Sequence, residues 1–240
     1  MRTQSALAAA AGLVALAFAL STLERWLDRR RRHELAWTVA LAMFTLGAGA
    51  LWLGASNGWN PATFRIFYLF GAILNVPFLA LGTVYLLGGP RRGDRWAAGV
   101  ALAGAFAAGV LAVAPMRAEV PAHRLPQGSE VFGPLPRILA AVASAGGALV
   151  VLGGAVWSAW RLRAGAGRTR PGGGRLALAN GLIALGTLVL GASGLLNSVL
   201  GEMEGFAVTL TAGITILFLG FLVTNPRREH VARPGKVGDT

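Results

Sequence analysis

Seven long apolar stretches constrain the fold of this chain more than any other feature of its sequence. A helix needs about 20 consecutive apolar residues to cross the roughly 30 Å hydrocarbon core of a bilayer. The spans that the stretches predict are 5–24, 35–56, 64–87, 96–115, 137–159, 176–198 and 206–224. Only 13% of the 240 residues are charged, against about 25% in a soluble domain. The sequence therefore predicts an all-α, multi-pass membrane protein, with a seven-helix bundle over residues 1–228 and a short cytoplasmic tail over 229–240.

The basic residues predict the orientation of this bundle. If successive loops are assigned alternately to the two faces, 17 Lys and Arg residues fall on one face and five on the other. Cytoplasmic loops carry the excess of Lys and Arg, so we expect the N-terminus outside, the C-terminus inside and the cell membrane as the location. Inner clusters such as 29–32 are expected to contact anionic lipid head groups. The net charge of +12 lies in these loops and not in a basic domain, so no nucleic-acid partner is expected.

The first apolar stretch also has the length of a secretory signal peptide. The strong basic cluster, Arg25 with 29–32, follows this stretch, which is typical of an uncleaved helix with its N-terminus outside. We therefore expect the stretch to be retained as the first span. The chain contains no cysteine, which excludes disulfides and thiolate chemistry.

A weak internal repeat relates the two ends of the chain. Residues 45–56 (TLGAGALWLGAS) and 187–198 (TLVLGASGLLNS) match at six of 12 positions, and the third and seventh spans both lead into Pro-Arg-Arg. The first and fifth spans both end near a Trp before an Arg-rich loop. All three matches fit a parallel 3+1+3 repeat, in which the fourth helix connects two three-helix units, and transporters with repeats place their sites at the repeat interface.

This layout resembles two families in architecture only. Sugar transporters of the SWEET and PQ-loop type have seven helices, an outer N-terminus and a 3+1+3 plan, but their Pro-Gln signature is absent from this chain. Microbial rhodopsins are similar in helix count and topology, and they need a Lys in the last helix for retinal. The predicted last span, 206–224, contains no Lys, so neither retinal nor another cofactor is expected.

Ionisable residues are absent from the middle of every predicted span. Such residues usually mark proton relays, ion pathways and voltage sensors in membranes, so their absence argues against those functions. Glu34, at the start of the second span, is explained by the helix macrodipole, which favours an acidic residue there. His123 and Met116 in the long outer loop are too few ligands to predict a metal site.

Neutral polar residues within the spans are the remaining candidates for a substrate site. Asn75 and Pro77 lie midway along the third span, where Pro77 cannot donate to the carbonyl of Ile73 and is expected to kink the helix. The Asn75 amide then has three possible partners: the freed carbonyls, a neighbouring helix or a solute. The further candidates in the sixth and seventh spans are Asn180, Thr187, Asn197 and Thr211. Such side chains either bond across helices or line a polar cavity, and Trp59, Glu202 and Glu204 are placed at its outer mouth.

Two classes of function remain open. The first is a small-molecule transporter or carrier with a neutral polar site between the two three-helix units, near Asn75, Asn180 and Thr187. The second is a non-enzymatic sensor, accessory subunit or scaffold that binds lipid or a partner protein. An enzyme is not expected, because no nucleophile, base or metal set converges in the sequence.

Overall fold

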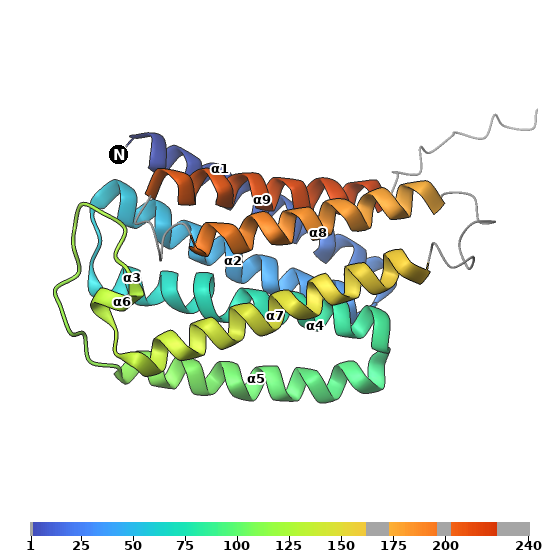
Figure 1. The fold of residues 1–240 in the computed structure, drawn as a ribbon, viewed down its shortest axis with the longest axis horizontal. Coiled ribbons are helices and arrows are strands. Elements are labelled where there is room, and N and C mark those ends of the chain that lie inside the picture. Colours follow the sequence, from blue (N-terminus) through green and yellow to red (C-terminus); the bar gives the residue numbers. More distant parts are fainter. Residues whose placement is uncertain (1, 162–172, 196–202, 225–240) are drawn as a thin grey trace, which may run out of the picture.

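The computed structural model describes residues 2–161, 173–195 and 203–224, and these parts of the chain fold into helices with no strand among them (Figure 1). The elements in chain order are α1 (Arg2–Arg29), α2 (Arg32–Asn57), α3 (Pro61–Phe67), the π-helix η1 (Tyr68–Leu74), α4 (Asn75–Gly88), α5 (Pro90–Val113), α6 (Gly128–Val131), α7 (Pro134–Arg161), α8 (Gly173–Leu195) and α9 (Met203–Thr224). The predicted tail, 229–240, lies outside the described residues.

Six helical segments are long and apolar enough to cross a bilayer: α1, α2, the continuous segment from α3 to α4, α5, α7 and α9. The protein is therefore an integral membrane protein. The predicted sixth span coincides with α8, a helix of 23 residues, in which Gly181–Leu190 is a shorter apolar stretch. The helices extend beyond most of the predicted spans because an α-helix continues through polar residues outside the hydrocarbon. For example, α5 begins at Pro90, six residues before the predicted start, and includes the basic turn Arg91–Arg95.

Short turns with glycine and proline separate α2 from α3 and α4 from α5. Gly58 adopts a φ of 90°, which favours glycine, and the Asn60 side chain then accepts a hydrogen bond of 2.9 Å from the Thr63 amide as the N-cap of α3. Gly89 has a φ of 77°, and Pro90 follows it at the first position of α5, where the missing N–H of proline is harmless. The sequence thus ends and restarts each helix within a few residues, which brings successive helices side by side.

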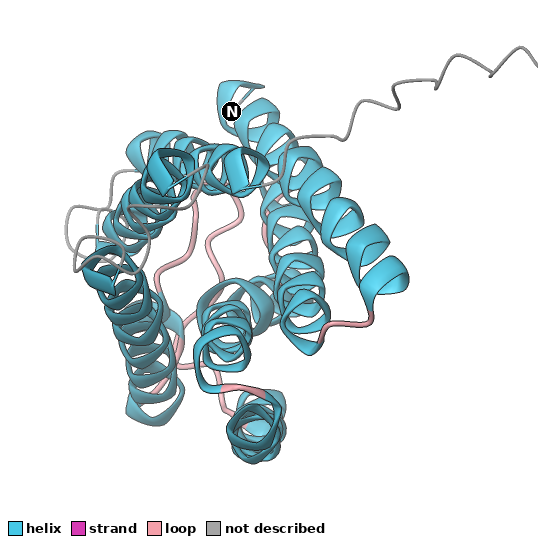
Figure 2. Cartoon of the chain, turned by 90° about the vertical axis from the view of Figure 1, so that its right-hand side faces the viewer, coloured by secondary structure: helices cyan, strands magenta, loops and turns pink. Residues whose placement is uncertain are grey.

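The long helices form a ring. Along this ring, α1 packs on α2, α2 on α4, α4 on α7, α7 on α8, α8 on α9, and α9 packs again on α1. Helix α5 lies outside the ring, against α4 and less extensively against α7. The view along the long axis shows this arrangement, with α5 at the periphery (Figure 2). Segments far apart in the sequence, α1 and α9, therefore close the bundle.

Two apolar clusters fill the described part of the bundle. The first lies near the start of α3 and includes Trp59, Phe64, Phe67, Tyr68, Phe132 and Phe206. Its rings contact one another, for example Phe64 with Phe132 at 5.3 Å between centroids. The second cluster joins α1, α2 and α9 through Phe18, Phe44 and Phe221. Between the clusters, Gly47 of α2 and Gly71 of η1 approach so closely that a Cβ on Gly47 would lie 3.0 Å from the Gly71 backbone.

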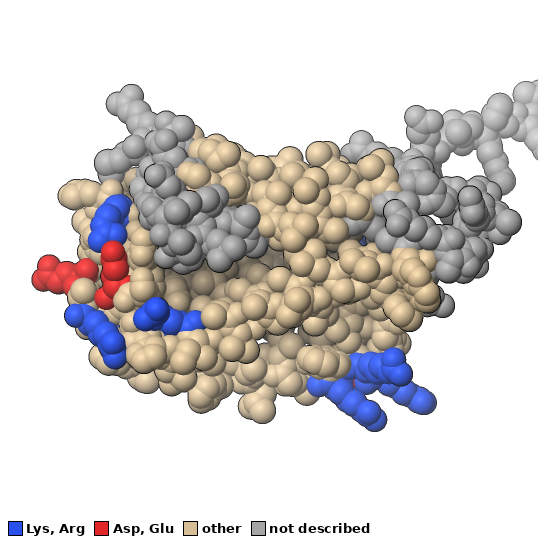
Figure 3. Space-filling view, in the orientation of Figure 1, with Lys and Arg blue, Asp and Glu red and all other residues tan. Residues whose placement is uncertain are grey.

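The charged side chains gather at the two ends of the long axis, and the described face between them is uncharged (Figure 3). This uncharged belt carries large exposed apolar residues, including Leu102, Val113, Val142 and Leu149. Exposed apolar side chains of this size are suited to lipid and not to water. The distribution is that of a helix bundle embedded in a bilayer.

Candidate functional site

The third spanning segment changes its helical form midway along its length. Residues Tyr68–Leu74 form a π-helix, and Asn75 begins the α-helix that follows. The sequence predicts an irregularity here from Pro77, and the structure places it about one turn before that proline. A π-helical turn adds a residue to the helix, and such turns are frequent at functional sites.

A hydrogen bond from α7 repairs part of the break. The Ser144 hydroxyl donates to the Ala72 carbonyl at 2.7 Å. Ala72 lies five residues before Pro77, the spacing of a π-helical hydrogen bond, and Pro77 has no N–H to donate. The α7 side chain thus supplies a donor that the proline cannot, and it ties α7 to the irregular segment.

Asn75 does not take part in this repair. Its side chain is only 8% exposed, and its Oδ1 atom is buried without a hydrogen-bond partner. A buried polar atom left unpaired costs about 1–3 kcal/mol. Residues 75, 79 and 82 share one face of a helix, and this face meets α2, because the Trp37 Nε1 donates to the Leu79 carbonyl at 3.2 Å and the Trp37 ring covers Gly82. Asn75 thus offers an unused acceptor inside the bundle, next to α2.

The polar residues predicted in the sixth and seventh spans have structural partners where they are described. The Thr187 hydroxyl is buried and donates to the Ile183 carbonyl of its own helix at 2.8 Å. The Thr211 hydroxyl contacts the Ala207 carbonyl at 2.8 Å and the Leu7 carbonyl of α1 at 3.1 Å, so it helps close the ring. Helix α7 lies between α4 and α8 in this ring, and the hydrogen bonds of Thr187 and Thr211 are made with residues other than Asn75. Asn197 lies outside the described residues, as does the side chain of Asn180.

The predicted outer mouth takes a different form. Trp59 is 5% exposed and packs edge-on against Phe64 and Phe67, so it belongs to the first apolar cluster and does not line an opening. Glu202 and the side chain of Glu204 lie outside the described residues. The face in Figure 3 is hollowed between α7 and α8, toward the end of the molecule at which α7 begins.

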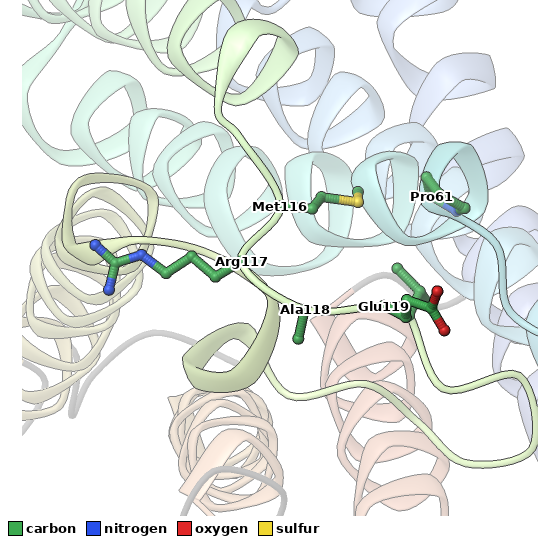
Figure 4. A pocket seen from close by; sticks show the side chains of 6 residues that line it. Pro61, Met116, Arg117, Ala118 and Glu119 are labelled. Atoms are coloured by element: carbon green, nitrogen blue, oxygen red, sulfur yellow. The ribbon is translucent and has the colours of Figure 1, made fainter.

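A second depression lies in the loop between α5 and α6. It has a volume of about 560 Å³ and is lined by Pro61 and the segment Met116–Val120. Its two charged side chains point away from each other, Arg117 toward one side and Glu119 toward the other (Figure 4). Because these groups do not converge on a common point, the depression is an open part of the surface and not a built site.

A buried polar cluster at the opposite end of the molecule escaped the sequence analysis. The Glu34 side chain is fully buried, at 0% exposure, and its Oε1 accepts hydrogen bonds from Arg25 Nη2 at 3.1 Å and Arg25 Nε at 3.3 Å. His33 Nε2 lies 3.9 Å from the same oxygen. Beside this pair, Thr38 contacts the buried Thr22 at 2.9 Å between hydroxyl oxygens. The helix macrodipole explains an acidic residue at this position, but it does not explain the burial.

Helical spacing contains a signal for this cluster. Thr22 and Arg25 are three residues apart on α1, and Glu34 and Thr38 are four apart on α2, so each pair shares one face of its helix. In a tight α1–α2 hairpin these two polar faces oppose each other. To predict this buried cluster from the sequence, one must know that α1 packs against α2, and apolar stretches alone do not show which helices are neighbours.

In comparisons with known proteins, no family model, no curated protein and no solved structure matches the chain.

Proposed function

We propose that the protein is a membrane carrier for a small molecule, with a neutral polar site at Asn75. The observation that carries this proposal is the Asn75 Oδ1 atom, which is buried without a partner at a π-helical break. A protein that kept Asn75 only for packing would gain stability from an apolar side chain of the same size. A solute with an O–H or N–H group would donate a hydrogen bond to this acceptor, so Asn75 would bind the solute.

The order of helices around the ring supports two repeated units. We propose that α8 also crosses the membrane and brings the number of spans to seven. Helices α1, α2 and α3–α4 then form one unit and α7, α8 and α9 the other, with α5 as connector. The ring order is α1, α2, α4, α7, α8 and α9. A rotation of the ring by three positions therefore places α1 on α7, α2 on α8 and α4 on α9. The α4–α7 contact then corresponds to the α9–α1 contact, as expected for a parallel 3+1+3 repeat. Asn75 belongs to α4, which takes part in one of these two interfaces, although the Asn75 face of α4 meets α2 within the first unit.

The charges support an orientation and a class of solute. The basic turns Arg29–Arg32 and Arg91–Arg95 lie at one end, where the excess of arginine favours the cytoplasm. We propose that these residues also contact anionic lipid head groups of the cell membrane. No charged side chain surrounds Asn75 among residues 68–88, and a buried charge without a counter-charge is strongly unfavourable. The solute is therefore uncharged.

Solute flux into proteoliposomes tests this proposal. The purified protein is reconstituted, and shrinkage and re-swelling of the vesicles are followed by light scattering for a panel of neutral solutes that includes polyols, sugars, amides and alcohols. We expect at least one solute to enter faster than into protein-free vesicles, and Asn75→Leu to abolish the increase. Asn57→Ala, at an exposed position on α2, is the matched control and keeps full flux. Equal flux in Asn75→Leu and the parent protein contradicts the site.

A second function, a membrane scaffold or accessory subunit, is favoured by the exposed face of α5. Leu102 is 75% exposed, and nothing lies within 4 Å of a Cβ added to Gly99 or Gly109. Small residues let helices of partner proteins approach closely. Replacing Gly99 and Gly109 by Leu distinguishes the two functions, since a scaffold loses its partner in cross-linked membranes while a carrier retains its flux.

A further inference from the structure

An aromatic contact crosses the inside of the ring at the end where α3 and α9 begin. The ring of Phe67 on α3 and that of Phe206 on α9 lie 6.2 Å apart between centroids. The α3–α4 segment and α9 hold opposite positions in the ring, so this contact spans its interior. Asn75 comes eight residues after Phe67 in the same segment, about two helical turns deeper. A solute that enters from this end therefore has to pass the Phe67–Phe206 contact to reach Asn75.

The connection between α5 and α7 places a segment, residues 118–130, over this end of the bundle (Figure 1). Its side chains divide between two environments: Leu125 and Pro126 are buried, whereas His123 and Arg124 are exposed. Burial of the apolar side chains favours the packed position of the segment, because it removes them from water. The segment is thus a cover with an apolar inner face and a polar outer face.

Contacts with two helical elements seat this segment. The Trp59 amide, in the turn between α2 and α3, donates to the Ala122 carbonyl at 3.0 Å. Gly128 approaches Tyr68, the first residue of the π-helix, so closely that a Cβ added to Gly128 would lie 2.6 Å from the Tyr68 ring. The segment therefore rests on the rim of the bundle and on the π-helix that leads to Asn75.

The two ends of the segment are joined to each other in a fixed base. The Arg117 amide donates to the Val131 carbonyl at 2.9 Å, and Met116 forms an antiparallel β-bridge with Phe132. Phe132 is fully buried against the rings of α3, and Arg65 of α3 binds carbonyls at the end of α5. Residues 118–130 can therefore move as one unit about a base that stays in place.

We propose that residues 118–130 are a hinged lid, called the outer lid below, which controls the access of solute to the Asn75 site from the outer side. This inference rests on the carrier function proposed above. The structure holds the lid closed. When the lid lifts, Phe67 and Phe206 are the side chains that remain between water and Asn75. Side-chain rotations are faster than loop motions, so the lid sets the rate of entry.

A disulfide that fixes the lid tests this proposal. A Cβ built on Gly58 lies 3.8 Å from the Ala122 Cβ, a separation typical of disulfides, and the chain has no native cysteine. Gly58→Cys/Ala122→Cys is reconstituted, and flux of the transported neutral solute is measured before oxidation, after oxidation and after renewed reduction. We expect oxidation to abolish the flux and reduction to restore it. The reduced protein is the matched control, because it carries the same strain from the positive φ at position 58.

A second pair of variants tests the lid without a cross-link. Gly128→Ala forces the lid away from the Tyr68 ring, whereas a Cβ on Gly133, in the base, would lie 3.4 Å from the flexible end of the Arg117 side chain. We expect solute uptake to be severalfold faster in Gly128→Ala than in Gly133→Ala, because the lid is then already displaced. This pair decides the question if the double-cysteine protein does not fold or does not form its disulfide.

The outcomes distinguish the lid from the carrier function. Flux that is lost on oxidation and restored on reduction supports the lid, as does faster uptake in Gly128→Ala. Equal flux in the oxidised and reduced double-cysteine protein overturns the lid, and so does equal uptake in Gly128→Ala and Gly133→Ala; both results leave the carrier function in place. Absence of flux for every solute in the parent protein overturns the carrier function, and the lid with it.

Discussion

Ser144 and Pro77 are predicted to be energetically coupled, although they lie on different helices. The Ser144 hydroxyl of α7 donates to the Ala72 carbonyl at 2.7 Å, and Pro77 is the residue whose missing N–H leaves the preceding turn short of a donor. Ser144→Ala removes the interhelical donor. Pro77→Ala restores an N–H to the segment that follows the π-helix, so that the main chain can supply a hydrogen bond of its own.

The size of the coupling follows from these contacts. Interhelical hydrogen bonds in membranes contribute about 0.6 kcal/mol on average and up to about 1.7 kcal/mol, and a buried acceptor left unpaired costs about 1–3 kcal/mol. We therefore expect Ser144→Ala to lower the free energy of unfolding by about 1–2 kcal/mol in the parent protein. In the Pro77→Ala background we expect a loss of less than about 0.5 kcal/mol. The coupling energy is then about 1 kcal/mol, beyond the roughly 0.3–0.5 kcal/mol scatter of independent sites.

A double-mutant cycle measures this coupling. The four proteins are unfolded reversibly in mixed micelles of increasing denaturing-detergent fraction, and helicity is followed by circular dichroism. Ser21→Ala is the matched control, because the Ser21 hydroxyl donates only to the Ala17 carbonyl of its own helix. Additive effects of Ser144→Ala and Pro77→Ala would refute the reasoning, because they would mean that the Ser144 bond does not compensate for the proline.

Three further predictions concern stability. Gly47→Ala places a Cβ 3.0 Å from the η1 backbone and is expected to lower the free energy of unfolding by about 1–3 kcal/mol. Gly49→Ala, with nothing within 4 Å of its Cβ, is expected to be neutral or stabilising by up to about 1 kcal/mol. Equal melting temperatures for the two variants contradict the close helix contact. Arg65 caps the end of α5 by donating to its carbonyls, including that of Ala114 at 2.8 Å. Arg65→Ala is therefore expected to lower the free energy of unfolding by about 1–3 kcal/mol. An unchanged melting temperature excludes this capping role. Asn75→Leu removes an unpaired acceptor and is expected to raise stability by about 1–3 kcal/mol; a lower melting temperature assigns Asn75 a structural bond.

The membrane class and the approximate helix positions could be predicted from the sequence because both depend on local composition. Apolar windows mark the hydrocarbon, and each of them coincides with a helix in the described residues. Helix ends were less accurate, as at Pro90, because a helix does not stop at the edge of an apolar window. The number of seven spans, their orientation and the repeat stay predictions.

The candidate site was predicted in part. The irregularity near Pro77 was expected from the chemistry of proline, but its π-helical form depends on contacts with α2 and α7, such as the Gly47–Gly71 approach and the Ser144 bond. Trp59 was placed at an outer mouth because it was expected near Glu202 and Glu204 in the outer loops, whereas it is buried in the first apolar cluster with Phe64, Phe67 and Phe132. Burial of Glu34 depends on the opposing face of α1, which only the tertiary fold determines.

The central claim, that Asn75 faces a solute pathway inside the ring, is tested most directly by its reactivity when it is replaced with cysteine. The chain has no native cysteine, so Asn75→Cys carries a single thiol. We predict that a small, uncharged, water-soluble thiol reagent modifies Asn75→Cys in proteoliposomes, whereas Leu102→Cys, on the lipid-facing surface of α5, stays unmodified. Unmodified thiols in both variants would contradict the account, because water would then not reach Asn75.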